Sequence, residues 1–129
     1  MRSALLIVLG LVIGIVGTVF AMNALHERQP YSHTLMMTMA HHAGALSAAV
    51  KAQQCDAAQA QHHLTRLLET QGDMTEAFPG VDQPFKDEIA KLHEKTQAAL
   101  QAAPATCAAL ATAIKPIGET CQSCHQQYR

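Results

Sequence analysis

The C-terminal segment carries the most regular pattern in the chain. Its apolar and sulfur side chains recur every three or four positions: Leu110, Ile114, Ile117, Cys121, Cys124 with His125, and Tyr128. This spacing follows the α-helical repeat of ~3.6 residues, so these side chains share one face of a helix expected over 106–128. Pro116 lies inside it and predicts a bend. The inward face of this helix therefore holds two thiols and an imidazole.

Three other segments show the same helical spacing. Their stripes are Leu35, Met36, Met39, Ala43, Leu46 and Val50; Ala60, Leu64 and Leu67; and Phe85, Ile89, Leu92, Thr96 and Ala99. We expect helices over 32–53, 57–72 and 84–102, with Asp56 as the N-cap of the second. Residues 78–84 hold two prolines and a glycine and predict the one long loop. The pattern predicts an all-α fold, an antiparallel up-down-up-down four-helix bundle over 23–129.

An uninterrupted apolar run from Ala4 to Met22 precedes this domain. At ~1.5 Å per residue, a helix of this length approaches the thickness of the bilayer hydrocarbon. We expect residues 1–22 to form a transmembrane anchor; a signal segment cleaved near Ala21 or Ala24 is the alternative. The positively charged Arg2 is expected to stay on the cytoplasmic side of the membrane, so the domain that follows is exported. In a bacterium this domain faces the periplasm, either anchored in the inner membrane or soluble after cleavage.

Charge and composition narrow the possible partners and contents of the domain. The chain has 9 Lys and Arg against 10 Asp and Glu, a formal net charge of −1, without a long basic run. We therefore expect no nucleic-acid partner. Tryptophan is absent and aromatic residues make up only 4% of the chain. Because large side chains are so few, a large flat cofactor would fill the space that they leave empty in the core.

The sequence Cys121-Gln-Ser-Cys124-His125 has the C-x-x-C-H spacing of c-type haem attachment. Two thiols bond to the two vinyl groups on one porphyrin edge, and the adjacent imidazole reaches the iron. The alternatives are a thioredoxin-like thiol pair, half of a zinc site, or a disulfide between the neighbours; no βαβ pattern or second ligand pair accompanies the motif. We expect one haem c, bound covalently to Cys121 and Cys124, with His125 as proximal iron ligand.

The tail Lys115-Pro-Ile-Gly-Glu-Thr-Cys-Gln-Ser-Cys-His-Gln-Gln-Tyr-Arg resembles the end of class II c-type cytochromes, the cytochrome c′ and cytochrome c556 family. The resemblance runs from about residue 28 onward, and C-x-x-C-H-x-x-Tyr-Arg at the chain end is its most specific part. It implies a haem held by the fourth helix of a bundle, with Tyr128 and Arg129 in its vicinity. It also implies a protein that is not an enzyme and that can form homodimers.

In the family that the chain resembles, one position of the first bundle helix decides the function. A methionine there gives six-coordinate iron and electron transfer, whereas an apolar residue leaves five-coordinate iron that binds NO or CO. Counting back from Lys51 and Asp56 places Met36 at this position, so the resemblance implies Met36 as the distal iron ligand. Met39 and His33 are alternatives, and Met36, Met37 and Met39 can instead all be core filling. We expect a carrier of single electrons for periplasmic or membrane redox partners, with the gas-binding protein as the alternative.

Two cysteines and several histidines lie outside the haem motif. Cys55 follows the first bundle helix and Cys107 begins the fourth, at turns that an antiparallel bundle places at one end, so we expect a Cys55–Cys107 disulfide. His41 and His42 are adjacent, as are His62 and His63. Adjacent residues on a helix point about 100° apart, so we expect solvated or haem-edge histidines rather than chelating pairs.

A further alternative is an exported copper- or zinc-binding protein. Met36, Met37, Met39, His41 and His42 supply suitable soft and imidazole donors. Their spacing along one helix does not gather them around one ion.

Overall fold

A computed structural model describes residues 2–26 and 30–128 of the chain. All regular elements in these ranges are helices, and neither range contains a strand. The helices are α1 (Arg2–His26), α2 (Tyr31–Lys51), α3 (Ala57–Gln71), α4 (Met74–Ala77), α5 (Gln83–Gln101) and α6 (Cys107–Tyr128). The predicted all-α class is confirmed. The short helix α4 lies where the sequence pattern predicts no helix.

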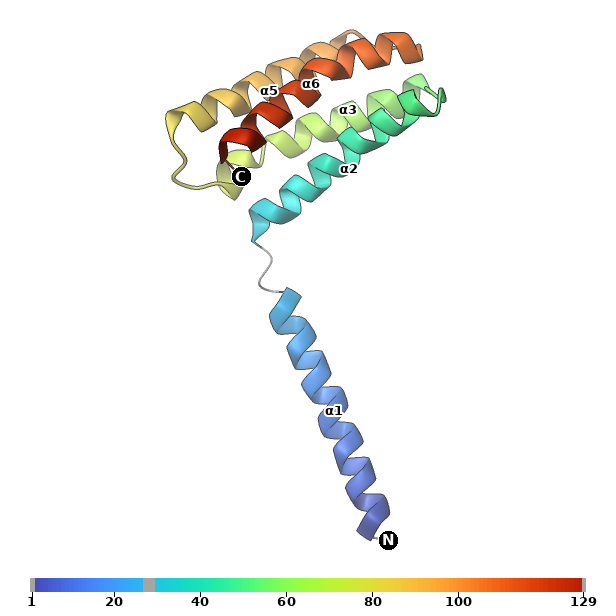
Figure 1. Ribbon diagram of the computed structural model, residues 1–129, viewed down its shortest axis with the longest axis vertical. Coiled ribbons are helices and arrows are strands. Elements are labelled where there is room, and N and C mark those ends of the chain that lie inside the picture. Colours follow the sequence, from blue (N-terminus) through green and yellow to red (C-terminus); the bar gives the residue numbers. More distant parts are fainter. Residues whose placement is uncertain (1, 27–29, 129) are drawn as a thin grey trace.

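The four long helices that follow α1, namely α2, α3, α5 and α6, pack side by side (Figure 1). Helix α2 contacts α3 and α6, and α5 contacts the same two helices, so each has two long neighbours. Figure 1 shows α2 and α3 running in opposite directions, as do α5 and α6. Their inward side chains form one apolar core, whose most deeply buried members are Leu64, Leu67 and Leu110. We call this part of the chain, α2 to α6, the helical domain.

Side-chain caps fix where three of the helices begin. The Asp56 carboxylate accepts a hydrogen bond from the Gln59 N–H at 2.8 Å, and Asp82 accepts one from the Phe85 N–H at 3.0 Å. The Thr106 hydroxyl accepts from the Ala109 N–H at 3.2 Å. Each cap satisfies a backbone donor that the first helical turn leaves without a partner.

Helix α2 ends two residues earlier than its apolar pattern predicts. Gln53 adopts a left-handed conformation with φ of 55°, which no α-helical residue has. The Gln54 N–H donates to the Ala49 carbonyl and the Gln53 N–H to the Val50 carbonyl, the pair of bonds that closes a helix C-terminus. Ala103, with φ of 44°, has the equivalent place after α5. The two turns therefore have similar local geometry.

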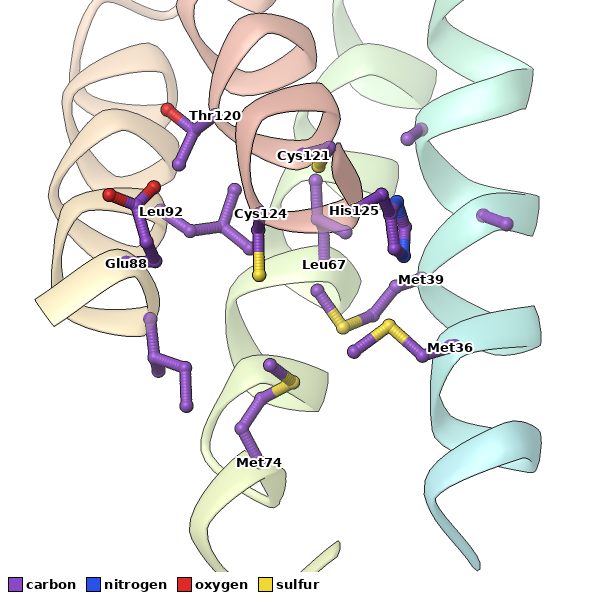
Figure 2. Close-up of a pocket in the computed structure, with 13 residues that line it drawn as sticks. Met36, Met39, Leu67, Met74, Glu88, Leu92, Thr120, Cys121, Cys124 and His125 are labelled. Carbon is purple, nitrogen blue, oxygen red and sulfur yellow. The ribbon is translucent and has the colours of Figure 1, made fainter. Parts of the chain in front are cut away.

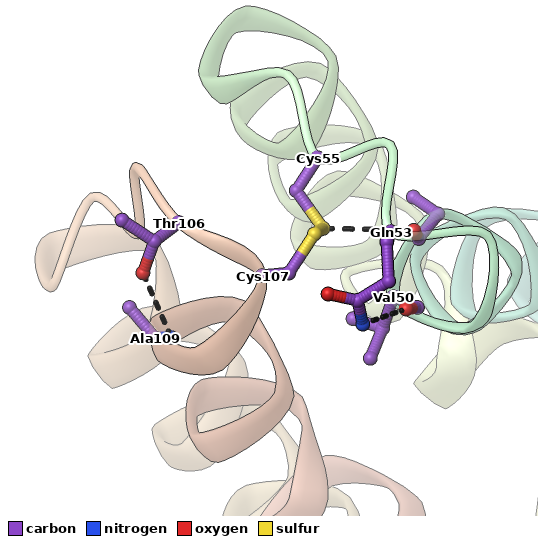
Figure 3. Close-up of a disulfide and its surroundings, with 7 residues drawn as sticks. Val50, Gln53, Cys55, Thr106, Cys107 and Ala109 are labelled. Atoms are coloured by element: carbon purple, nitrogen blue, oxygen red, sulfur yellow. Dashed lines mark hydrogen bonds between the residues drawn. A yellow bond between two sulfur atoms is a disulfide. The ribbon is translucent and has the colours of Figure 1, made fainter.

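A disulfide joins these two turns (Figure 3). Cys55 lies between α2 and α3, and Cys107 is the first residue of α6; their Cα atoms are 5.2 Å apart, although 52 positions separate them in the sequence. The bond therefore connects the first pair of long helices to the second pair at one end of the helical domain.

Helix α1 is built almost entirely of apolar residues. The window Leu6–Asn23 has a mean hydropathy of 2.4, and none of it is buried against other parts of the chain. By length and composition this helix is able to cross a membrane, a property that it shares with signal sequences.

Candidate functional site

A cavity opens between the helices at the end of the domain opposite the disulfide. Its empty space is about 700 Å³, the part open to solvent included. Every helix of the helical domain contributes to its lining, which consists of Met36, Met39, Ala40, Ala43, Leu67, Met74, Glu88, Ile89, Leu92, Thr120, Cys121, Cys124 and His125 (Figure 2). Ten of these thirteen side chains are apolar or carry sulfur, so the cavity suits a largely apolar group.

Helix α6 brings the C-x-x-C-H motif to this cavity. Cys121, Cys124 and His125 stand at i, i+3 and i+4, on neighbouring positions of one helix side, and all three line the cavity. Both thiols are free and half-buried, whereas His125 is exposed. Ile117, one turn before Cys121, is buried in the core and holds this side of α6 inward.

Burial raises the pKa of both thiols. For Cys121 the neighbouring Cys124 acts in the same direction, and for Cys124 the carboxylate of Glu88 adds to the effect of burial. Both groups are therefore protonated thiols at neutral pH rather than thiolates. This state contrasts with the depressed pKa of reactive cysteine pairs in redox enzymes.

Three methionines line the same cavity from other helices. Met36 and Met39 come from α2 and Met74 comes from α4; Figure 2 shows the thioethers of Met36 and Met39 close together on the α2 side. Met39 and Met74 belong to the buried core, while Met36 is half-buried and packs against it. Met37 points elsewhere and is 59% exposed. His33, an alternative ligand in the sequence analysis, is exposed and does not line the cavity.

The structure places Tyr128 beside the cavity lining rather than in it. Its ring packs edge-on against Phe85, with centroids 4.9 Å apart and an interplanar angle of 88°. Its hydroxyl donates a hydrogen bond to Asp82 at 3.2 Å. These contacts attach the end of α6 to the start of α5. Arg129, the other residue expected near the cofactor, lies outside the described residues.

Several lining residues do not follow from the sequence pattern. Met74 lies on the unexpected helix α4, in a segment too short to show periodicity. Glu88 and Thr120 are polar and lie next to the inward stripes of α5 and α6, where a pattern of apolar residues does not identify them. Leu67 and Leu92 were expected only as core residues.

The donor set of this cavity fits haem c. Cys121 and Cys124 supply the two sulfur atoms that attach the macrocycle, and His125 supplies an imidazole beside them. The methionine thioethers across the cavity are the type of second axial ligand found in many c-type cytochromes. The apolar walls suit the hydrophobic faces of the group.

Residues 81–129 match the family model described as Cytochrome C'. The matched segment contains α5 and α6, and thus the whole Cys-Gln-Ser-Cys-His motif, but not α2 with its methionines. No curated protein and no solved structure matches the chain. The family match over residues 81–129 and the C-x-x-C-H motif at the cavity together support a class II c-type cytochrome with one covalently bound haem c.

Proposed function

We propose that this protein is a monohaem carrier of single electrons whose iron has His125 and Met36 as axial ligands. The observation that carries the proposal is that one cavity is lined both by the α6 residues Cys121, Cys124 and His125 and by the α2 thioether of Met36 (Figure 2). A family member without a methionine facing the motif would lack the second axial ligand.

Burial favours Met36 over Met39 as this ligand. Met39 is only 6% exposed and is part of the core cluster, so moving its thioether toward an added group would open the core. Met36 is half-buried at the edge of the same cluster. Its long unbranched side chain can therefore turn toward the iron without leaving a void.

The residues around the proposed ligands suit outer-sphere electron transfer. A bound haem c with two protein ligands exchanges one electron, and a methionine ligand raises its reduction potential. The apolar lining, which includes Leu67, Ile89 and Leu92, keeps water from the group. Filling both axial positions with protein side chains keeps the ligand set the same in both oxidation states, which limits the rearrangement on electron transfer.

We further propose that the helical domain is the antiparallel four-helix bundle of class II cytochromes, held at the outer face of a bacterial inner membrane. The side-by-side packing of α2, α3, α5 and α6 supports the bundle. The length and hydropathy of α1 support an anchor, and the disulfide supports an oxidising compartment. The electron donors and acceptors would then be periplasmic or membrane redox proteins.

Optical spectra of the full chain, produced with c-type maturation machinery, test the axial ligand. The wild type should give a narrow ferrous α band and a weak far-red methionine-to-iron band when oxidised. Met36→Ala should abolish the far-red band and give high-spin haem. Met37→Ala is the matched control, because Met37 is next to Met36 but 59% exposed, and it should leave both spectra unchanged.

Two results would contradict the assignment. If Met39→Ala abolishes the far-red band and Met36→Ala does not, Met39 is the ligand. If the wild-type spectrum is high-spin, unchanged by Met36→Ala and sharpened only by carbon monoxide, the distal position is open and the protein is a gas binder.

A further inference from the structure

Four histidines from two neighbouring helices form one cluster outside the cavity. His41 and His42 lie on α2, and His62 and His63 lie on α3. The ring centroids of His42 and His63 are 5.3 Å apart, those of His41 and His63 6.2 Å, and those of His42 and His62 6.3 Å. None of the four lines the cavity that holds the cysteines and methionines. The expectation of solvated or haem-edge histidines is therefore wrong for His42, which is only 8% exposed, whereas His41 and His62 are exposed as expected.

The two inner histidines face each other through the same ring atom. The Nδ1 atoms of His42 and His63 are 3.0 Å apart, so one ring donates its N–H to the lone pair of the other. Two imidazole nitrogens that bind one ion at ~2.0–2.1 Å lie about 2.9–3.4 Å apart for ligand angles from square-planar to tetrahedral. The observed separation thus suits a metal ion in place of the shared proton.

Burial positions these two rings. His42 is 8% exposed and His63 is half-buried, so their side chains are held by the packing of α2 on α3. His41 and His62 are exposed beside them. Their side chains can rotate because solvent surrounds them, which would bring a third nitrogen to an ion held by the inner pair. Among the described residues, no set of three or more His, Cys, Asp or Glu side chains is already arranged to hold a metal ion.

Burial and, to a smaller extent, neighbouring charges favour the neutral form of both rings. Burial lowers the pKa of His42 and of His63, and the other histidines of the cluster act in the same direction. Arg66 on α3 also lowers the pKa of His42, although its guanidinium forms an ion pair with Glu69 at 2.7 Å. Neutral imidazole is the form that ligates metal ions.

We propose that His42 and His63 bind one borderline divalent transition-metal ion, of the class of Zn²⁺ or Cu²⁺, through their Nδ1 atoms and apart from the haem. The ion takes the place of the proton shared between the rings. The ring that donated this proton carries a proton at Nε2 instead, so both rings bind the ion as neutral imidazoles. Water, or the rings of His41 and His62, completes the coordination. The site does not use Met36, Met37 or Met39, and it does not depend on which residue is the distal iron ligand.

Calorimetric titration of the full-length holoprotein with zinc chloride tests this proposal, at pH 7.5 in a buffer that does not bind metals and after treatment with chelator. We expect one Zn²⁺ per chain and at least a tenfold loss of affinity in His42→Gln and in His63→Gln. His93→Gln is the matched control, since His93 is an exposed histidine on α5, and its affinity should equal that of the wild type. The haem spectrum of each variant verifies that the fold is intact.

Electron paramagnetic resonance of the Cu²⁺-loaded holoprotein provides an independent readout. Coupling of the copper to at least two nitrogens, lost in His63→Gln, supports the site. The proposal is overturned if the wild type shows no saturable one-to-one binding, or if the affinity is retained in His63→Gln. It is also overturned if His93→Gln weakens metal binding as much as His42→Gln and His63→Gln do. Because His63 is only half-buried, its variant keeps the test valid even if His42→Gln does not fold.

Discussion

One carboxylate oxygen of Asp82 accepts hydrogen bonds from two segments, the N–H of Phe85 at 3.0 Å and the hydroxyl of Tyr128 at 3.2 Å. The first bond caps α5, and the second attaches the end of α6 to it. Phe85 itself packs against the Tyr128 ring. The helix that carries the haem-attachment motif is therefore fastened at its end, directly after the motif.

Replacing Asp82 by Ala removes both hydrogen bonds and should destabilise the protein by about 1–2 kcal/mol, since loss of an N-cap costs about that much. Tyr128→Phe keeps the ring packing and removes only an exposed hydrogen bond, so we expect a smaller loss, of about 0.5 kcal/mol. Denaturant unfolding of the holoprotein measures both. Asp87→Ala, a nearby exposed carboxylate, should change stability by less than about 0.5 kcal/mol. Equal effects of all three variants would contradict a special role for Asp82.

Removing the disulfide should lower stability without changing the haem site. The bond closes a loop of 52 residues, for which the chain-entropy relation gives about 4 kcal/mol. Cys55→Ala with Cys107→Ala should therefore unfold at clearly lower denaturant concentration and keep the haem spectrum of the wild type, because these residues lie at the far end of the domain. A changed spectrum would show that the disulfide also shapes the cavity. The wild type with its disulfide intact and with its disulfide reduced gives a matched comparison of unfolding.

A glycine at position 103 should stabilise the protein. Ala103 is exposed and has φ of 44°, a left-handed conformation that costs a residue with a Cβ atom up to about 1 kcal/mol relative to glycine. Part of this gain is lost because glycine is more flexible in the unfolded chain, so we expect Ala103→Gly to gain about 0.5 kcal/mol. The neighbouring Ala102 is helical, with φ of −67°, and Ala102→Gly should be destabilising. If both variants changed the stability in the same direction, the left-handed conformation of Ala103 would not be the cause.

The pair His42 and His63 should make stability depend on pH. Burial and neighbouring charges lower the folded-state pKa of both below the ordinary value of 6.5. As the pH falls below 6.5, these histidines therefore bind protons in the unfolded chain before they do so in the folded chain. The stability that the pair contributes at higher pH is lost as the pH falls from 6.5 to the lower folded-state pKa. The melting temperature should fall over this interval in metal-free wild type and less steeply in His63→Gln. The melting temperature of His93→Gln should depend on pH as that of the wild type does. An unchanged pH dependence in His63→Gln would contradict a role for His42 and His63 in it.

The amino-acid sequence was sufficient to predict the long helices, though not the short helix α4. The spacing of residues such as Leu64 and Leu67, or Leu110 and Ile117, is a local property that any α-helix converts into one apolar face. The C-x-x-C-H motif was equally readable, because its chemistry depends on three positions within one helical turn. The end of α2 was less predictable, since the left-handed Gln53 is not a glycine and gives no signal of the turn.

The sequence pattern did not predict which residues of different helices come together. Met74 reaches the cavity only because α4 folds back against α2, and a segment of four helical residues has no measurable period. The histidines show the same limit: considered along one helix, His41 and His42 point apart, and so do His62 and His63.

The sequence by itself determined the helical class, the apolar N-terminal helix and the haem-attachment motif, because each of these depends on residues close together in the chain. Only the tertiary structure decided which side chains meet across helices. The angle and axial offset at which α2 packs on α3 and α6 place Met36 at the cavity and His42 against His63. These quantities result from the packing of the whole core, so no single segment encodes them.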